Sequence, residues 1–296
     1  MLEKKKQAKN TRYVAASRLF STGVLRNIAK KGDFSEFRSL CVDAGIDLAA
    51  SEEKTAAHAF ESAFELLRTS GLRSEYVYKA ALTHNVLLGT HSLATASMVN
   101  EFRAGRSKAD VVIFNGTSTA YEIKSDRDNL GRLAGQIADY RRVFARNFVI
   151  CSASHLNEVQ SVLPDDVGIL LLTRWNRIST FRTATPDISS LCLNTIFSSL
   201  TNLEIKNIIA KCGERVPDVP NTRLRRTMSK TFEHLNPANA HNAMVATLRK
   251  TRSKESLREA LQNFPKSVMP AVMNLRLTMP ERENLSNAMK VKLASL

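Results

Sequence analysis

The fold is decided by residues 107–125, which read SKADVVIFNGTSTAYEIKS. Four apolar residues at 111–114 favour a short β-strand, and the Asn115-Gly116 pair that follows is a strong signal for a hairpin turn. A second run, ending in Tyr121-Glu122-Ile123-Lys124, predicts the returning strand. We therefore expect this stretch to form an antiparallel hairpin.

Glu122 and Lys124 are the residues of this hairpin that need an explanation. Because side chains alternate along a strand, both lie on one face of the second strand, while Tyr121 and Ile123 lie on the other. Burying charged groups costs free energy unless they are paired or bind a metal. A divalent-metal site is the explanation that we favour.

Asp110, at the start of the first strand, would complete a metal site with Glu122. Two hard carboxylate ligands suit Mg²⁺, which otherwise keeps water and substrate phosphate in its coordination sphere. A two-residue turn would place Asp110 on the wrong face for Glu122, so we predict either a three-residue loop with a glycine bulge or a bend at Asp110. Lys124 would then favour the ionised form of the attacking water or stabilise charge that develops on the phosphate.

Two flanking segments contribute further candidates. Residues 93–102 predict a helix that brings Glu101, a third carboxylate, close to the hairpin. Residues 130–144 predict an amphipathic helix in which Gln136 and Tyr140, four residues apart, share a face. The alternatives are an ordinary surface glutamate, a helix-flank glutamine and a core tyrosine.

Taken together, these motifs resemble the PD-(D/E)xK nucleases, in which an aspartate precedes Glu-x-Lys. The Gln-x-x-x-Tyr spacing resembles the additional motif of the RecB-like nucleases. Within this superfamily the chain is similar to the sce7726 family, through Asn100, Glu101, Phe102, Asp110, residues 121–126, Asp128, Arg132, Leu133, Gln136, Ile137, Tyr140 and Phe144.

The resemblance implies an α/β fold with a restriction-endonuclease-like core, in which helices flank a mixed β-sheet. It also implies metal-assisted hydrolysis of a DNA phosphodiester bond. The implied ligands of Mg²⁺ or Mn²⁺ are Glu101, Asp110, Glu122 and the Ile123 carbonyl, and the other implied catalytic residues are Lys124, Gln136 and Tyr140.

The charge of the chain favours a polyanionic partner. Its 296 residues carry a formal net charge of +15, and DNA is the expected partner. No stretch combines a strong apolar face with the Trp and Lys rim typical of a membrane-surface helix. Candidate phosphate contacts near the hairpin are Arg106, Lys108, Arg132 and Arg141.

No run of about eighteen apolar residues predicts a membrane span, and the charged start lacks the pattern of a signal peptide. We therefore expect a cytoplasmic protein. The four cysteines are too scattered for a zinc site or for the clustered iron–sulfur pattern of some RecB-like nucleases, so reduced thiols are expected.

Three regions are expected along the chain. Residues 1–89 form a helical N-terminal region, residues 90–185 the nuclease core, and residues 186–296 a basic helical C-terminal region. Within the core, residues 148–151 and 167–172 predict buried parallel strands, 156–163 a helix and 177–181 an edge strand.

The sequence leaves several alternatives open. The same fold could bind nucleic acid without cutting it, or act on RNA or branched DNA. A helical interaction protein with an acidic partner is a rival from another class. The oligomeric state is not fixed, and a homodimer is compatible with the sequence.

Overall fold

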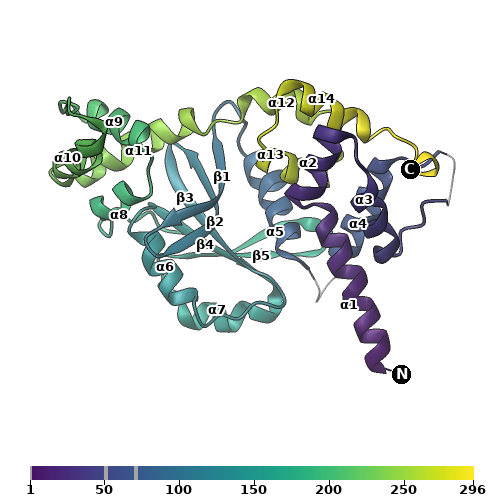
Figure 1. Cartoon of the computed structure of the whole chain (residues 1–296). Helices are drawn as coiled ribbons and strands as arrows, with labels where there is room; N and C mark the ends of the chain where they lie inside the picture. Colours follow the sequence, from purple (N-terminus) through teal and green to yellow (C-terminus); the bar gives the residue numbers. More distant parts are fainter. Residues whose placement is uncertain (1, 50–52, 70–72) are drawn as a thin grey trace. The chain divides into compact units, whose positions relative to one another are not determined.

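The computed structural model describes residues 2–49, 53–69 and 73–296 (Figure 1). The chain divides into two compact units, one formed by Met1–Thr83 with Glu255–Leu296 and the other by His84–Lys254. The expected C-terminal region of residues 186–296 is therefore shared between the two units. Within the described ranges, no helix has both the length and the hydropathy that crossing a membrane requires.

The first unit is helical. α2 illustrates why: Val24, Leu25, Ile28 and Ala29 recur at helical spacing and are buried, and Gly32 ends the helix in the left-handed conformation. The helices of this unit are α1 (Leu2–Leu19), α2 (Thr22–Lys31), α3 (Ser35–Ala44), α4 (Ala56–Leu67), α5 (Glu75–Ala81), α12 (Arg258–Leu261), α13 (Met269–Asn274) and α14 (Met279–Ala288). α1 to α5 lie within residues 1–89, which the sequence predicts to be helical.

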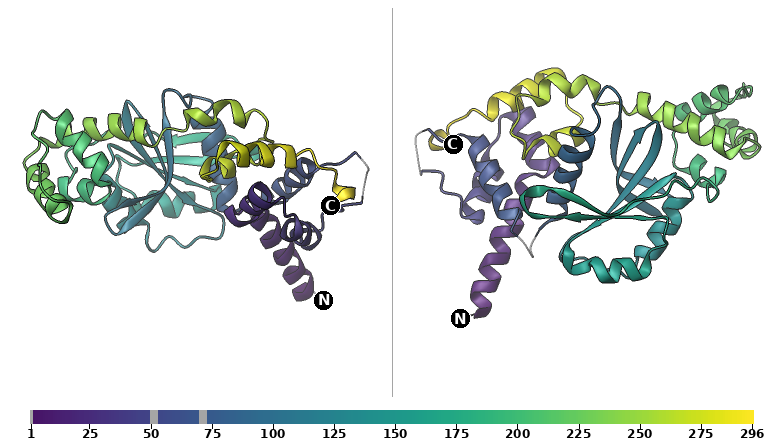
Figure 2. Two further views of the ribbon diagram at one scale, coloured as in Figure 1. Left: turned by 45° about the horizontal axis from the view of Figure 1, so that its top comes forward. Right: turned by 180° about the vertical axis from the view of Figure 1, so that it is seen from behind.

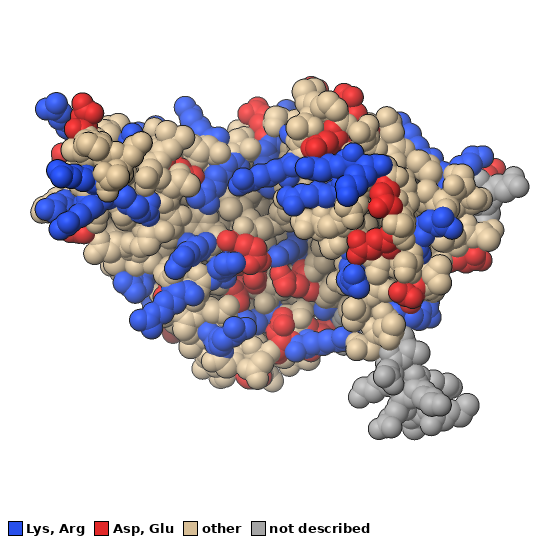
Figure 3. Space-filling view, in the orientation of Figure 1, with Lys and Arg blue, Asp and Glu red and all other residues tan. Residues whose placement is uncertain are grey.

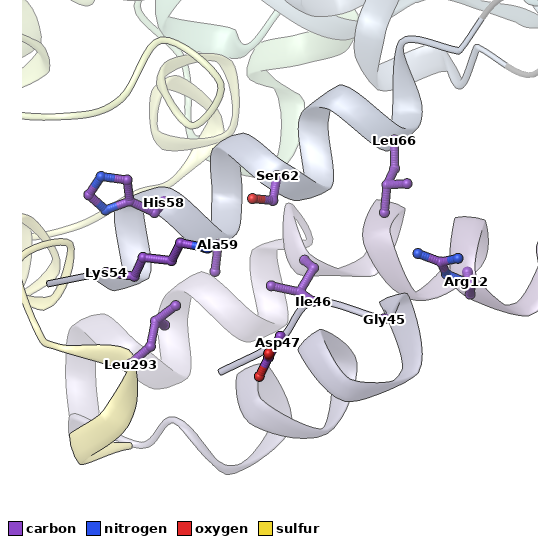
Figure 4. A pocket seen from close by; sticks show the side chains of 10 residues that line it. All are labelled: Arg12, Gly45, Ile46, Asp47, Lys54, His58, Ala59, Ser62, Leu66 and Leu293. Atoms are coloured by element: carbon purple, nitrogen blue, oxygen red, sulfur yellow. The ribbon is translucent and has the colours of Figure 1, made fainter. Parts of the chain in front are cut away.

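A pocket of about 230 Å³ lies within this helical unit (Figure 4). α1 supplies Arg12 to its wall and α4 supplies Ser62 and Leu66, while Gly45 follows α3. None of the predicted site residues lines it.

The second unit is built on a mixed β-sheet, which has six strands in the part of the chain that the structure describes. The strands follow the chain in order, from β1 to β6. β1, β2 and β3 pair antiparallel, β3, β4 and β5 pair parallel, and β6 returns antiparallel to β5. Their bounds are β1 (Ser97–Ala104), β2 (Ser107–Asn115), β3 (Thr117–Lys124), β4 (Arg146–Cys151), β5 (Gly168–Leu172) and β6 (Ile178–Arg182).

One face of this sheet carries a continuous apolar core. Val112, Phe114, Ala120, Val149 and Ile169 pack there with residues of the surrounding helices. Figure 2 shows the helices of this unit, coloured from teal to light green. They are α6 (Leu133–Arg141), α7 (Leu156–Val162), α8 (Leu193–Ser198), α9 (Asn202–Lys211), α10 (Asn221–Glu233) and α11 (Pro237–Thr251).

Most of the elements expected in the core are confirmed, and one expectation is wrong. The hairpin, the parallel strands, the edge strand and the helices near 130–144 and 156–163 are present. Residues 93–102 do not form a helix, because the segment from Ser97 pairs with β2 as strand β1 and this tertiary pairing overrides the local spacing. Beyond the core, Thr201 and Glu204 form a capping box that starts α9 as a helix separate from α8.

A buried hydrogen bond connects α11 to β3. The Ser118 hydroxyl lies 2.7 Å from Nε2 of His241 and accepts a hydrogen bond from the backbone N–H of Ala145 at 3.0 Å. The hydroxyl proton is therefore available to Nε2 of a neutral imidazole. Burial lowers the pKa of His241, because a charged ring would lose its hydration there.

This histidine predicts a pH-dependent stability. Because the pKa of His241 is lower in the folded chain, the unfolded chain binds the proton more readily. The free energy of unfolding should fall as the pH drops below about 6.5 and should be unaffected by this group at higher pH. Urea denaturation across this pH range measures the effect. His241→Gln should flatten the profile, whereas the exposed His234→Gln should leave it unchanged, and parallel profiles for all three proteins would contradict the assignment.

Candidate active site

The β2–β3 hairpin places Asp110 and Glu122 across from each other. Phe114 pairs with Ser118 and Asn115 with Thr117, so Gly116 alone lies between the paired strands. Gly116 has a φ of 65°, in the region that favours glycine. The ladder ends at the pair of Val111 and Tyr121, and the same register extended by one position sets Asp110 opposite Glu122. The two-residue turn, which would have placed Asp110 on the wrong face, is therefore absent, and the register is the one that the predicted three-residue loop requires.

β1 and β2 are irregular where Glu101 meets Asp110. Asn100 pairs with Val111 and Phe102 with Ala109, but the pair between them is missing from the ladder. Glu101 has a φ of 54°, a conformation that costs a residue with a side chain about 1–2 kcal/mol. A carboxylate oxygen of Glu101 and one of Asp110 lie within 4.8 Å of each other.

The side chain of Asp110 accepts a hydrogen bond from the backbone of β3. Its Oδ2 accepts a hydrogen bond from the backbone N–H of Ile123 at 2.7 Å. Ile123 lies between Glu122 and Lys124, so this contact fixes the Asp110 carboxylate beside the Glu-x-Lys segment. Asp110 is half-buried, whereas Glu101 is exposed.

Glu122 and Lys124 form a buried ion pair that α6 completes. Lys124 Nζ donates to Glu122 Oε1 and to Gln136 Oε1, both at 2.9 Å. The side chains of Lys124 and Glu122 are 7% and 2% exposed. The Tyr140 hydroxyl lies 2.6 Å from the other carboxylate oxygen, Oε2 of Glu122. The structure thus brings together Glu122, Lys124, Gln136 and Tyr140.

The Tyr140 hydroxyl has one proton and two close acceptors. Besides Glu122, the backbone carbonyl of Lys108 lies 2.6 Å away, so the proton is shared between them. Burial raises the pKa of Tyr140, and the negative charges of Glu122 and Asp110 raise it further. Tyr140 therefore remains a neutral hydrogen-bond donor and cannot act as a general base near neutral pH.

Helix α6 holds these side chains because residues four apart, on successive turns of a helix, lie on the same side. Leu133, Ile137 and Tyr140 are buried on its inner face, and Gln136 lies on the flank that meets Lys124. The expectation that Gln136 and Tyr140 share a face is confirmed.

Asp139 is a residue of the site that the sequence analysis missed. Its Oδ2 accepts hydrogen bonds from the Ser107 hydroxyl at 2.7 Å and from the backbone N–H of Arg106 at 3.2 Å. Gly105 has a φ of 60°, and a Cβ added there would lie 2.7 Å from Oδ1 of Asp139. Gly105, between the strand residues Ala104 and Ser107, is the sequence signal for this β1–β2 turn.

The four candidate phosphate contacts have different environments. Arg106, Lys108 and Arg132 are exposed, as contact with a polyanion requires. Arg141 is half-buried, and its guanidinium lies 3.1 Å from the Asp166 carboxylate and 3.3 Å from that of Asp187. These two ion pairs use the charge of Arg141 inside the unit, which favours a structural role for it.

The hydroxyl of Tyr140 provides a test of this arrangement. Tyr140→Phe removes a donor from two acceptors, so we expect the free energy of unfolding to fall by about 1–3 kcal/mol, measured by urea denaturation. Tyr121→Phe is the matched control, because Tyr121 is also a buried ring next to the site and none of the described residues is seen to hydrogen bond to its hydroxyl. The control should lose less than about 0.5 kcal/mol, and equal losses in both variants would refute the shared-proton arrangement.

Comparison with known proteins gives three similarities. Protein cII of Enterobacteria phage P4 is 32% identical over 111 residues, which cover 36% of this chain and 38% of that protein. The SPO1766 protein of unknown function from Silicibacter pomeroyi, a solved structure, is 20% identical with a TM-score of 0.28, over 36% of this chain and 69% of that one. The family described as Bacteriophage P4 protein cII matches residues 68–274. Because this match spans more than half of the 296 residues of the chain, the chain belongs to the Bacteriophage P4 protein cII family.

Proposed function

We propose that this chain is a metal-dependent nuclease that hydrolyses phosphodiester bonds of DNA, on a restriction-endonuclease-like core near residues 90–185. The observation that supports this proposal is the convergence of Glu122, Lys124, Gln136 and Tyr140 in one buried hydrogen-bonded group. Asp110 lies beside them on the Ile123 N–H. An aspartate, Glu-x-Lys and Gln-x-x-x-Tyr are the three motifs on which the resemblance to RecB-like nucleases depends.

The oxygen atoms at this site fit Mg²⁺ or Mn²⁺. Glu101 and Asp110 offer hard carboxylate oxygens close to each other, and the Ile123 N–H holds Oδ2 of Asp110 beside the Glu-x-Lys segment. Glu122 would bind the same ion after giving up its contact with Lys124 or Tyr140. The Ile123 carbonyl remains an expected further ligand. A bound divalent ion would supply a polarised phosphoryl oxygen and an acidified water.

Lys124 is the residue that acts on the phosphate in this proposal. Its ammonium group has three hydrogens, and Glu122 and Gln136 accept two of them. The third hydrogen is available to a phosphate oxygen, on which negative charge grows during the reaction. Gln136 and Glu122 therefore orient Lys124, and Tyr140 orients Glu122.

A second candidate function is nucleic-acid binding without cleavage. The observation that favours it is that both carboxylate oxygens of Glu122 are engaged, by Lys124 and Tyr140, in a nearly inaccessible position. An ion pair that never opens would leave Glu122 unable to bind a metal. Cleavage of RNA or of branched DNA are further alternatives within the nuclease proposal.

Substrate assays test the proposed reaction. Purified protein is incubated with linear, circular, branched and single-stranded DNA and with RNA, in Mg²⁺, in Mn²⁺ or in EDTA. We expect cleavage of DNA that requires the divalent ion. Activity that persists in EDTA, or no cleavage of any substrate despite binding, would contradict the metal-dependent nuclease.

Substitutions at the site provide the sharper prediction. Asp110→Ala and Lys124→Ala should each lower the cleavage rate by about 10²–10⁴-fold, because each removes a group expected to stabilise the developing charge. Affinity for DNA, measured in EDTA, should stay close to that of the wild type. Lys290→Ala, which removes an exposed ammonium group from the helical unit, is the control and should cut normally. Undiminished cleavage by both site variants would overturn these roles.

A further inference from the structure

Helix α10 carries a stripe of three cationic side chains that faces away from the core. Arg223, Arg226 and Lys230 are three and four residues apart, so at 3.6 residues per turn they lie within an arc of about 60°. The buried residues of the helix centre about 170° away, on the opposite side. These buried residues are Leu224, Met228 and Phe232.

The stripe differs from two other arginines of this region, Arg225 and Arg252, which have structural partners. Arg225 donates to the Leu200 carbonyl and to Asn202, and its guanidinium lies 4.8 Å from the centre of the Phe197 ring. Arg252 pairs with the buried Glu204 at 2.8 Å. In contrast, Arg223, Arg226 and Lys230 are exposed, and the structure shows no ion pair between them and any acid of the described ranges.

The arrangement of the stripe is unfavourable for an isolated helix. Arg226 and Lys230 are like charges at i and i+4, and Arg223 and Arg226 at i and i+3. Such pairs destabilise a helix by about 0.2–0.5 kcal/mol each. α10 contains one acidic residue, Glu233, and its carboxylate accepts a hydrogen bond from Ser229. A polyanion on this face would relieve the repulsion.

Figure 3 shows further Lys and Arg side chains gathered over α9, α10 and α11. In α11 the last turn carries Arg249 and Lys250, both exposed. The stripe is therefore part of a wider region of positive potential within the sheet unit.

We infer that Arg223, Arg226 and Lys230 bind the phosphate backbone of a nucleic-acid duplex. Arg223 and Lys230 are seven residue steps apart, which is about 10 Å along the helix, and this length matches about three phosphate-to-phosphate intervals of one strand. The apolar residues of α10 are buried, so the helix offers no apolar face to a bilayer surface. The choice of nucleic acid as the polyanion rests on the proposed function, but binding here requires neither the metal nor cleavage.

The test compares two triple variants that lose the same charge. The first is Arg223→Gln/Arg226→Gln/Lys230→Gln. The matched control is Arg26→Gln/Arg38→Gln/Lys290→Gln, which removes three exposed cations from the helical unit. Affinity for a fluorescein-labelled linear DNA duplex is measured by anisotropy in EDTA, between about 50 and 200 mM salt. Circular dichroism checks that both variants remain folded.

We expect the stripe variant to bind at least about 10-fold more weakly at about 100 mM salt. The slope of log affinity against log salt should become shallower by about three, because each lost phosphate contact removes about 0.9. The control should change the slope by less than about one. Unchanged binding by the stripe variant, or an equal loss in the control, would overturn the inference. The inference would also fail if the stripe variant lost binding to anionic vesicles or polyglutamate but not to the duplex.

The outcome is separable from that of the cleavage assays. If the wild-type protein binds the duplex through the stripe but cuts nothing with Mg²⁺, the proposed nuclease activity fails and the stripe stands. If the protein cuts DNA but the stripe variant binds as the wild type does, the stripe fails and the nuclease proposal stands.

Discussion

The ion pair between Glu122 and Lys124 is the constraint around which the sheet unit is arranged. Removing two charges from water costs several kcal/mol for each ion, and mutual attraction offsets this only when further hydrogen bonds satisfy both groups. Gln136 and Tyr140 provide those hydrogen bonds from α6. α6 must therefore stay against β3, and through Tyr140 and Asp139 it also contacts residues 106–108, where the β1–β2 turn leads into β2.

The backbone is strained at Glu101, which faces Asp110 next to this ion pair. Glu101 adopts a left-handed conformation, and the ladder between β1 and β2 skips the position where it faces Asp110. A regular strand would satisfy more backbone groups, so the irregularity persists only because the surrounding contacts enforce it. Among these contacts is the Asp110 bond to the Ile123 N–H. Strain beside a buried ionic group is typical of functional sites, and this supports a role for Glu101 beyond that of a surface residue.

The sequence predicts those parts of the unit that depend on local signals. Asn115-Gly116, the apolar runs that became β4 and β5, and the spacing of Gln136 and Tyr140 are read within a few residues, and each was right. Residues 93–102 were misassigned because their apolar spacing suits a helix, while their pairing with β2 is a tertiary effect. Asp139 and the partners of Arg141 could not be found either, because the groups that they contact lie between 25 and 46 residues away.

Net charge is a coarse guide to binding, as the arginines of α10 demonstrate. Arg225 and Arg226 are adjacent, yet Arg225 packs on Phe197 and donates to Asn202, whereas no such partner of Arg226 is seen among the described residues. Cations that are held by partners within the chain are less available to a polyanion, and the attraction of the remaining ones is screened by salt. Lys124 lies in a buried, low-dielectric position, where screening is much weaker. In the proposed nuclease, binding and chemistry would therefore depend on two populations of positive charge, and salt would act on the first far more than on the second.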